Sequence, residues 1–203
     1  MELYVFRGEH KNRSEELLKK AIEVYVSKNS DTNLGLSCSG LDQAKLKRTE
    51  SGKPYFEEYP LCFSISHTGE FWSCLIASEN VGLDIQQKQK SNFEKLANRF
   101  FLDEEIKFVR DNGSDGFFDI WVRKEACIKY FGTGIRDLRT FSVVKDGKLA
   151  EEISLKGKDV KLATKAALED SVCFIKAFEL APDVTGAYCC ATKGTDLWIR
   201  ELS

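Results

Sequence analysis

The 203-residue sequence has few of the residues on which several common functional sites depend. It contains two histidines, His10 and His67, which lie far apart in the chain, so multi-histidine metal centres and HExxH proteases are excluded. The phosphate-binding motifs GxxxxGK(S/T) and GxGxxG are absent, and so is the GxSxG turn of many serine hydrolases. The sequence therefore does not support the ordinary nucleotide-binding and hydrolase sites that carry those motifs.

Long apolar runs and a strong charge imbalance are also missing. No stretch of 18 or more apolar residues occurs, so no transmembrane helix is predicted, and the polar start of the chain does not resemble a secretory signal. The 30 Lys and Arg residues are nearly balanced by 32 Asp and Glu residues, which makes sequence-independent nucleic-acid binding a poor fit. We expect a cytoplasmic protein with no membrane or nucleic-acid partner.

The seven cysteines form no CxxC pair, and their number is odd. This usage favours reduced, mostly buried thiols in a cytosolic protein. Cys189 and Cys190 are adjacent, so on a strand their side chains would point to opposite faces, which argues against one shared metal ion.

The pattern of apolar residues predicts an α+β fold with two halves, 1–87 and 88–203. Ser14–Lys28 has one apolar helical face, with Ser14 as the expected cap, and Asp31–Gly40 is expected to be a loop. Further helices are expected at Asn92–Phe101, Asp103–Asp111 and Phe117–Phe131, the last ended by Gly132. Strands are expected at Leu61–Ser66, Phe71–Ser78, Val81–Gln86, Arg139–Lys145, Leu149–Leu155, Ser171–Leu180, Gly186–Thr192 and Asp196–Leu202.

Asp84 lies on one of these expected strands. Alternation along Val81–Gln86 places Gly82, Asp84 and Gln86 on one face. A carboxylate beside a glycine gap could bind a hard cation and leave room for a phosphate group. The alternative is an ordinary solvent-facing carboxylate on a half-buried strand.

A second group of candidates lies on the helix expected at Phe117–Phe131. Trp121, Glu125 and Lys129 are spaced four residues apart and share a helical face, so a carboxylate and an ammonium could bind a metal and a phosphate side by side. An ordinary surface pair of Glu125 and Lys129 is the alternative. His67, where a strand meets an expected turn, could contact phosphate oxygens or make only a local hydrogen bond.

Five segments of the chain form an ordered set of motifs. They are Gly52-Lys53-Pro54, Phe63–Gly69, Val81–Ile85, Trp121–Lys129 and Gly132–Ile135. Their order and spacing resemble the 4′-phosphopantetheinyl transferases of the Sfp type. The resemblance implies Mg²⁺-dependent transfer of phosphopantetheine from coenzyme A to a serine of an apo acyl or peptidyl carrier protein, with release of 3′,5′-ADP. It also implies a pseudo-dimer of two similar α+β halves, each with antiparallel strands packed on helices, with the active site between them.

The resemblance also assigns roles to individual residues. Asp84 and Glu125 match the family's Mg²⁺ ligands, and Glu125 also matches a group that takes the proton from the carrier serine. Lys129, with Lys124 nearby, would bind the pyrophosphate and assist the leaving group. The remaining coenzyme A contacts would come from Lys53, Ser66 and His67.

The sequence departs from the family pattern at two places. Gln86 stands where the family usually has a second acid, and a neutral amide is a weaker Mg²⁺ ligand. The segment before Gly52 is short, so contacts to the 3′-phosphate are not securely placed. Two alternative functions stay open: a non-catalytic homologue that binds coenzyme A or a carrier protein, and another Mg²⁺-dependent phosphodiester enzyme. The internal pseudo-dimer favours a monomer.

Overall fold

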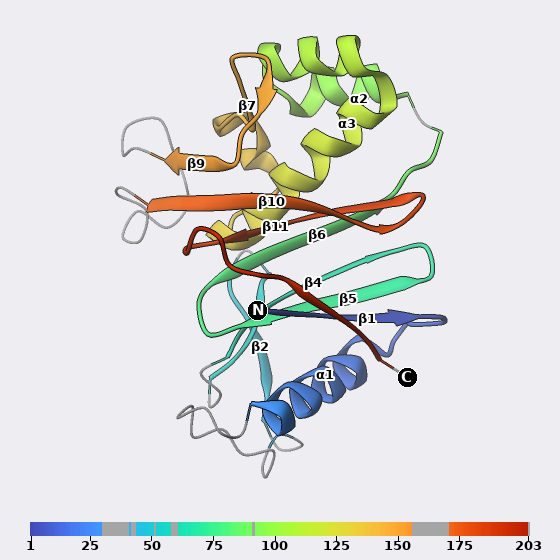
Figure 1. Ribbon diagram of the computed structural model, residues 1–203, viewed down its shortest axis with the longest axis vertical. Helices are drawn as coiled ribbons and strands as arrows, with labels where there is room; N and C mark the ends of the chain where they lie inside the picture. Colours follow the sequence, from blue (N-terminus) through green and yellow to red (C-terminus); the bar gives the residue numbers. More distant parts are fainter. Residues whose placement is uncertain are drawn as a thin grey trace.

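The computed structural model describes residues 1–29, 41, 44–50, 52–57, 61–90, 92–155 and 171–202. Within these residues the chain forms four layers, in the order helix, sheet, sheet, helix (Figure 1). The mixed α+β class predicted from the sequence is confirmed. The expected loop at Asp31–Gly40 lies outside the described residues. No helix in the described part of the chain is long and apolar enough to cross a membrane.

Two four-stranded sheets form the two middle layers, with strand orders β12-β1-β5-β4 and β6-β11-β10-β9 in the described chain. The first contains β1 (Glu2–Arg7), β4 (Cys62–Thr68), β5 (Phe71–Ala77) and β12 (Trp198–Glu201). The second contains β6 (Val81–Gln87), β9 (Glu152–Leu155), β10 (Ser171–Ala181) and β11 (Val184–Cys190). Two small hairpins pair β2 (Leu46–Arg48) with β3 (Pro54–Phe56) and β7 (Val144–Lys145) with β8 (Lys148–Leu149).

Helices cover the outer face of each sheet (Figure 1). Helix α1 (Ser14–Lys28) packs on the first sheet, whereas α2 (Phe93–Phe100) and α3 (Asp103–Phe131) pack on the second. A 3₁₀ helix, η1 (Ile135–Thr140), follows α3. Gly132 ends α3 in the left-handed conformation that favours glycine (φ 65°), as the sequence predicts.

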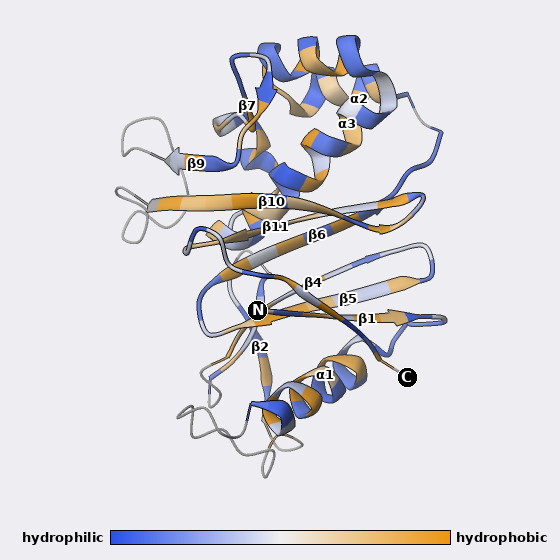
Figure 2. Cartoon of the chain, in the orientation of Figure 1, coloured by the Kyte–Doolittle hydropathy of each residue, from blue (hydrophilic) through white to orange (hydrophobic). Residues whose placement is uncertain are grey.

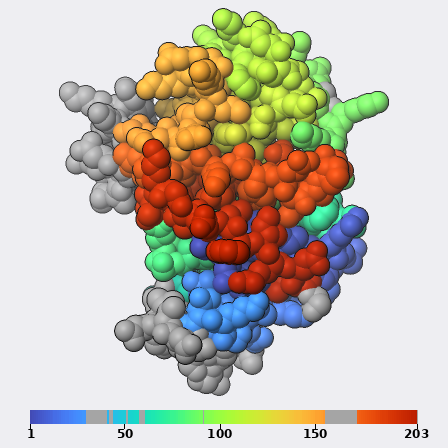
Figure 3. Space-filling view, viewed as in Figure 1, coloured from blue at the N-terminus to red at the C-terminus, as the bar shows by residue number. Residues whose placement is uncertain are grey.

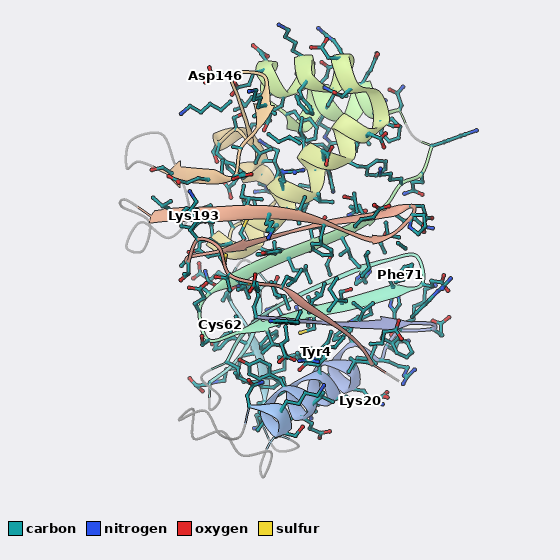
Figure 4. All side chains as sticks on the ribbon, in the orientation of Figure 1. Tyr4, Lys20, Cys62, Phe71, Asp146 and Lys193 are labelled. Carbon is teal, nitrogen blue, oxygen red and sulfur yellow. The ribbon has the colours of Figure 1, made fainter. Side chains whose placement is uncertain are left out.

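Each interface between layers has its own apolar core. The side chains of α1 meet the first sheet around Tyr4 and Trp72, and Tyr4 is labelled between β1 and α1 in Figure 4. A second core lies between the two sheets and includes Leu75 and Leu83. A third, rich in phenylalanine, joins the second sheet to α2 and α3. Figure 2 shows the apolar residues concentrated where the layers face one another.

The pairing of strands crosses the boundary expected at residue 87. Strand β6 precedes that boundary but pairs with β11, and β12 from the end of the chain pairs in parallel with β1. Figure 3 shows this C-terminal segment, in red, lying against the N-terminal part, in blue. The division into halves 1–87 and 88–203 stays a prediction.

Several local predictions need correction. Ser14 begins α1 but does not cap it, because its hydroxyl accepts a hydrogen bond from the Trp72 indole (3.0 Å). Strand β4 runs through Thr68, so His67 lies in the strand and not in the turn. The helices expected on either side of residue 113 form one element, interrupted where Gly113 adopts φ 64° and ψ −143°.

The region after α3 also differs from the prediction. The strand expected at Arg139–Lys145 does not form as a whole: its first two residues end the 3₁₀ helix η1, the next three are irregular, and only the last two form β7. Two short strands, β8 and β9, replace the single one expected at Leu149–Leu155. Local propensity favours strands here, but the packing of Leu138 and Phe141 into the core beneath α3 requires a tighter turn.

Candidate active site

Hydroxyl groups join the two sheets along one edge. On β4, the hydroxyls of Ser64, Ser66 and Thr68 accept hydrogen bonds from the backbone N–H groups of every second residue of β6, starting at Leu83, at 3.0, 3.2 and 2.9 Å. The other edge of β6 pairs with β11 in the usual antiparallel way. Residues at positions i, i+2 and i+4 of a strand share a face, so this spacing holds β6 along its whole length.

Asp84 lies at the centre of this junction. Its carboxylate is only 3% exposed, and Oδ1 accepts hydrogen bonds from the Ser66 hydroxyl (2.8 Å) and the Lys129 ammonium (2.8 Å). Lys129 also donates to the Ser66 oxygen (3.1 Å). The Ser66 hydroxyl therefore uses its single donor and both acceptor positions within this network. This places Ser66 as the group that orients Asp84.

Helix α3 sits directly on β6 at Gly82. A Cβ atom at this position would lie 2.0 Å from the Ala126 carbonyl oxygen and 2.5 Å from the Tyr130 nitrogen. The space beside Asp84 is thus filled by helix backbone, which corrects the expectation that the Gly82 gap leaves room for a phosphate. Its effect is to bring the face of α3 that carries Glu125 and Lys129 against Asp84.

Glu125 completes a pair of carboxylates at this point. Burial, followed by the negative charge of Asp84, raises the pKa of Glu125 to about 7, although the Lys129 ammonium opposes the rise. Two hard oxygen donors that repel each other, with a single ammonium between them, match the preference of Mg²⁺ for a few carboxylates completed by water and phosphate oxygens. Asp84 and Glu125 therefore fit a divalent hard cation.

Gln86 lies beside the same carboxylate. Its side-chain nitrogen donates to Asp84 Oδ2 at 3.4 Å, a long hydrogen bond. The amide thus presents its donor end to Asp84. This orientation suits a group that supports the carboxylate better than one that binds a cation directly.

A cavity of about 330 Å³ opens next to Lys129. The described residues that line it include several cationic or polar side chains and no carboxylate. A partly open cavity with donors and positive charge on its walls favours an anionic ligand such as a phosphate. The lining residues are Ser14, Arg48, Gly52, Lys53, Pro54, Ser64, Ile65, His67, Lys129, Gly132 and Thr133.

Lys53 reaches this cavity from the turn between β2 and β3. Its ammonium donates to the Asn80 side-chain oxygen (2.7 Å) and to the Val81 carbonyl (3.0 Å), and burial lowers its pKa to about 8. Both acceptors are neutral, so the cation lacks a countercharge among the groups that bind it. An anion in the cavity would supply that charge.

His67 lies on the rim of the cavity, and its ring centroid is 5.4 Å from that of His10. Partial burial, with the nearby charges of His10 and Lys129, lowers the pKa of His67. The lowered pKa favours the neutral imidazole, which offers one N–H donor. A phosphate close to the ring would favour its protonated form.

Lys124 is not part of this site, which argues against the expected contact with coenzyme A. Its ammonium is fully buried and donates to both carboxylate oxygens of Glu105 (2.7 and 2.8 Å) and to the Phe141 carbonyl (2.5 Å). Adjacent residues of a helix point about 100° apart, so Lys124 faces the core while Glu125 faces β6. The other predicted residues, Lys53, Ser66, His67, Asp84, Gln86, Glu125 and Lys129, lie in or beside the site.

Sequence reasoning missed two features. The alternating hydroxyls of Ser64, Ser66 and Thr68 were a visible signal, but only the register of β4 against β6 shows what they bind. Thr133 follows α3 and lines the cavity, and its buried hydroxyl has no hydrogen-bond partner in the described structure. A buried hydroxyl without a partner is a candidate to bind a ligand.

A carboxylate pair beside a cationic cavity is typical of enzymes that transfer phosphate-bearing groups with a divalent metal. Comparison with known families agrees. The model of the 4′-phosphopantetheinyl transferase superfamily matches residues 80–192, more than half of the chain. The chain belongs to this superfamily. The matched region includes Asp84, Glu125 and Lys129 but not Lys53 or His67.

Individual relatives support this membership. The chain is 31% identical over 150 residues to the 4′-phosphopantetheinyl transferase Sfp of Bacillus subtilis, covering 70% of this chain and 61% of the relative. A second B. subtilis 4′-phosphopantetheinyl transferase is 31% identical over 161 residues, covering 75% and 66%. The AcpT transferase of Escherichia coli is 41% identical over 90 residues, covering 41% and 46%. The chain thus spans about two thirds or less of the length of these relatives.

Proposed function

We propose that this protein transfers the 4′-phosphopantetheine group from coenzyme A to a serine of an apo acyl or peptidyl carrier protein, with Mg²⁺, and releases 3′,5′-ADP. One observation carries the proposal: Lys129 belongs both to the carboxylate site of Asp84 and to the cationic cavity. A metal held by carboxylates and a phosphate group in the cavity would therefore be neighbours. The reaction itself is inferred from the family and the relatives, which are named 4′-phosphopantetheinyl transferases.

Asp84 and Glu125 would hold the Mg²⁺ ion, which would supply positive charge to the pyrophosphate of coenzyme A. Ser66 keeps Asp84 oriented, and Gln86 supports the second carboxylate oxygen. Because Lys129 contacts Asp84 Oδ1, the Oδ2 atom is the freer of the two for a cation.

The cavity residues would bind the phosphates. Lys129 can donate to the pyrophosphate and offset the negative charge that gathers on the departing 3′,5′-ADP. Lys53 and His67 would contact other phosphate oxygens, and the unpartnered Thr133 hydroxyl is placed to donate as well. Arg48, also in the lining, is a candidate for the 3′-phosphate contact that the sequence does not place.

In the reaction, the carrier serine oxygen attacks the phosphorus that bears pantetheine, and the bond from that phosphorus to the bridging oxygen breaks. Glu125 would accept the serine proton, directly or through water. Lys129 would stabilise the leaving phosphate. Each group acts from a fixed position because α3 is seated on β6 at Gly82.

The four-layer arrangement supports a pseudo-dimer, since each sheet carries helices on its outer face and the site lies where the sheets meet. Two halves within one chain would make the site complete in a monomer. A cytoplasmic location and an apo acyl or peptidyl carrier protein as partner stay predictions from the sequence and the family.

The deciding experiment incubates the protein with coenzyme A, Mg²⁺ and apo acyl carrier protein, and measures the carrier by mass spectrometry. We expect addition of one phosphopantetheine group, dependent on Mg²⁺. Glu125→Gln should lower the rate about a thousandfold, equivalent to roughly 4 kcal/mol, while the exposed control Lys95→Ala leaves it unchanged.

Other outcomes distinguish the alternatives. Binding of coenzyme A and carrier without any adduct would indicate a non-catalytic homologue. Cleavage of coenzyme A or of a nucleic acid without transfer would indicate another phosphodiester enzyme. Full turnover by the folded Glu125→Gln variant would contradict the assigned site.

A further inference from the structure

Three cysteines from three separate elements meet beneath the helix that carries the proposed catalytic groups. They are Cys127 on α3, Cys173 on β10 and Cys189 on β11, and all three are fully buried. Their sulfur atoms lie within 4.8 Å of one another, and Cys127 and Cys189 Sγ are 3.3 Å apart. The proposed transfer reaction uses none of them.

The strand register explains this meeting. Cys189 pairs with Ile175, so Cys173, two residues earlier on β10, is its diagonal neighbour on the same face. That face packs against α3, and Cys127 projects onto it. Cys190 points to the opposite face, into the core between the sheets, as alternation along a strand requires.

We infer that Cys127, Cys173 and Cys189 form a binding site for a thiophilic d¹⁰ metal ion such as Zn²⁺. A zinc–sulfur bond is about 2.3 Å, so three sulfurs around one ion lie roughly 3.8–4.0 Å apart. The Cys127–Cys189 distance of 3.3 Å is about half an ångström below that value, and every pair lies within 4.8 Å, so small side-chain adjustments would place the three sulfurs around one ion. Thiolate ligands select soft ions over Mg²⁺, so this site is chemically separate from the carboxylates.

The buried, apolar surroundings indicate that an ion bound here would stabilise the fold and would not take part in the reaction. The three sulfurs are enclosed by apolar residues of the core between α3 and the second sheet. Cys127 lies two residues from Glu125 and from Lys129 on α3. An ion bound here would tie α3 to β10 and β11 and fix the helix that presents those two side chains. The alternative is that the three thiols act only as small apolar core residues.

The test titrates the reduced full-length protein with Cd²⁺, which gives an ultraviolet charge-transfer band only when bound by thiolate sulfur. The protein is refolded in the presence of the ion so that burial does not block entry. We expect one Cd²⁺ per chain, displacement of the band by Zn²⁺, and a higher thermal unfolding midpoint. Mg²⁺ should neither produce nor displace the signal.

Matched variants identify the ligands. Cys173→Ala and Cys189→Ala should each weaken Cd²⁺ binding by more than about tenfold, since changes even in groups that only support ligands typically cost 10–100-fold. Cys190→Ala, next in the chain but on the other face, and Cys62→Ala, on β4 in the other sheet (Figure 4), should keep the band. Cys173→Val tests the same ligand with the buried volume retained if the alanine variant fails to fold.

Clear results would overturn the inference. A parent protein that shows no band and no stabilisation has no such site, and the thiols are then core residues only. A band that survives in the folded Cys173→Val variant at full affinity comes from other cysteines. Because the readout is sulfur-specific and needs no coenzyme A, its failure leaves the proposed transferase activity untouched.

Discussion

Helix α3 contributes two lysines, five residues apart, to two ion pairs with carboxylates. The inner pair is Lys124 with Glu105 and the outer pair is Lys129 with Asp84, and they differ in how far they are buried and hydrogen-bonded. Lys124 and Glu105 are both fully buried, and each Lys124 proton has an acceptor. Lys129 and Asp84 meet at a similar distance of 2.8 Å, but Lys129 is 28% exposed and borders a cavity. The first pair is saturated and can only support the fold. The second leaves part of the Lys129 side chain exposed to the cavity.

The Glu105 carboxylate connects the inner pair to three parts of the chain. Besides Lys124, its carboxylate accepts hydrogen bonds from the backbone nitrogens of Leu102 and Val143 (both 2.9 Å). It therefore joins the start of α3, the middle of α3 and the segment after η1. Burial lowers the pKa of Lys124, and the neighbouring Glu105 opposes that shift.

The largest effect should come from breaking this inner pair. Glu105→Gln leaves the Lys124 ammonium buried without a countercharge, which typically costs about 3–5 kcal/mol. We expect that loss in the free energy of unfolding measured with urea. The double variant Glu105→Gln with Lys124→Met should recover part of it, because no charge is left buried and the amide oxygen of the introduced glutamine can still accept a hydrogen bond from one of the two backbone nitrogens. Equal stability of the parent and Glu105→Gln would contradict the structural role.

Breaking the outer pair should affect catalysis instead. Lys129→Ala should lower kcat by roughly 10²–10³-fold, with a smaller rise in the KM for coenzyme A, because the charge is needed most in the transition state. Stability should also fall, because the buried Asp84 carboxylate loses its cationic partner, but by less than in Glu105→Gln, since Lys129 is partly exposed. Steady-state kinetics and urea unfolding of the same sample check both statements. A change confined to KM would limit Lys129 to ground-state binding.

The stability of the protein should also depend on pH through Glu125, which lies beside the outer pair. Glu125 faces Asp84 and Lys129, and its pKa in the folded protein is raised from 4.5 to about 7. Below pH 4.5 the Glu125 carboxyl is protonated in both the folded and the unfolded protein, so it does not lower the free energy of unfolding. Between pH 4.5 and 7 the unfolded chain loses its proton first, so the stability of the metal-free protein falls as pH rises.

The variant Glu125→Gln has no ionisable group at this position, so it should not show this fall in stability between pH 4.5 and 7. The variant should match the parent near pH 4.5 and exceed it above pH 7 by at most about 3.5 kcal/mol, since one pKa unit corresponds to about 1.4 kcal/mol. Unfolding is measured across this pH range in the presence of a chelator. Adding Mg²⁺ should reduce the difference by stabilising the parent carboxylate. Parallel stability curves for the two proteins would show that Glu125 is not perturbed in this way.

The smallest effect should come from Gln86, which touches the outer pair from the side. Gln86→Ala should reduce activity by at most about 10–100-fold, the usual range for a group that supports a metal ligand. Asp84→Ala should raise the Mg²⁺ requirement much more, whereas Gln86→Glu should lower it. Mg²⁺ titrations of the transfer rate compare the three. Equal damage from Gln86→Ala and Asp84→Ala would make the amide a direct ligand.

Much of the fold follows from local patterns. The bounds of α1 and the three strands β4, β5 and β6 are close to those predicted, because apolar periodicity and turn residues decide them locally. Alternation on β6 also predicted that Asp84 and Gln86 share a face, which their hydrogen bond confirms. The stretch after Thr133 was harder, because its core contacts, not its propensity, determine the 3₁₀ turn.

The sequence by itself determined the family and the candidate residues of the site: its order of motifs pointed to Asp84, Glu125 and Lys129, and the family match covers all three. Only the tertiary structure decided which lysine serves which purpose. Lys124 and Lys129 lie on one helix and look equivalent in the sequence, but close packing at Gly82 turns one toward Asp84 and leaves the other in the core beside Glu105. Long-range contacts of this kind depend on how layers pack, which no local pattern encodes.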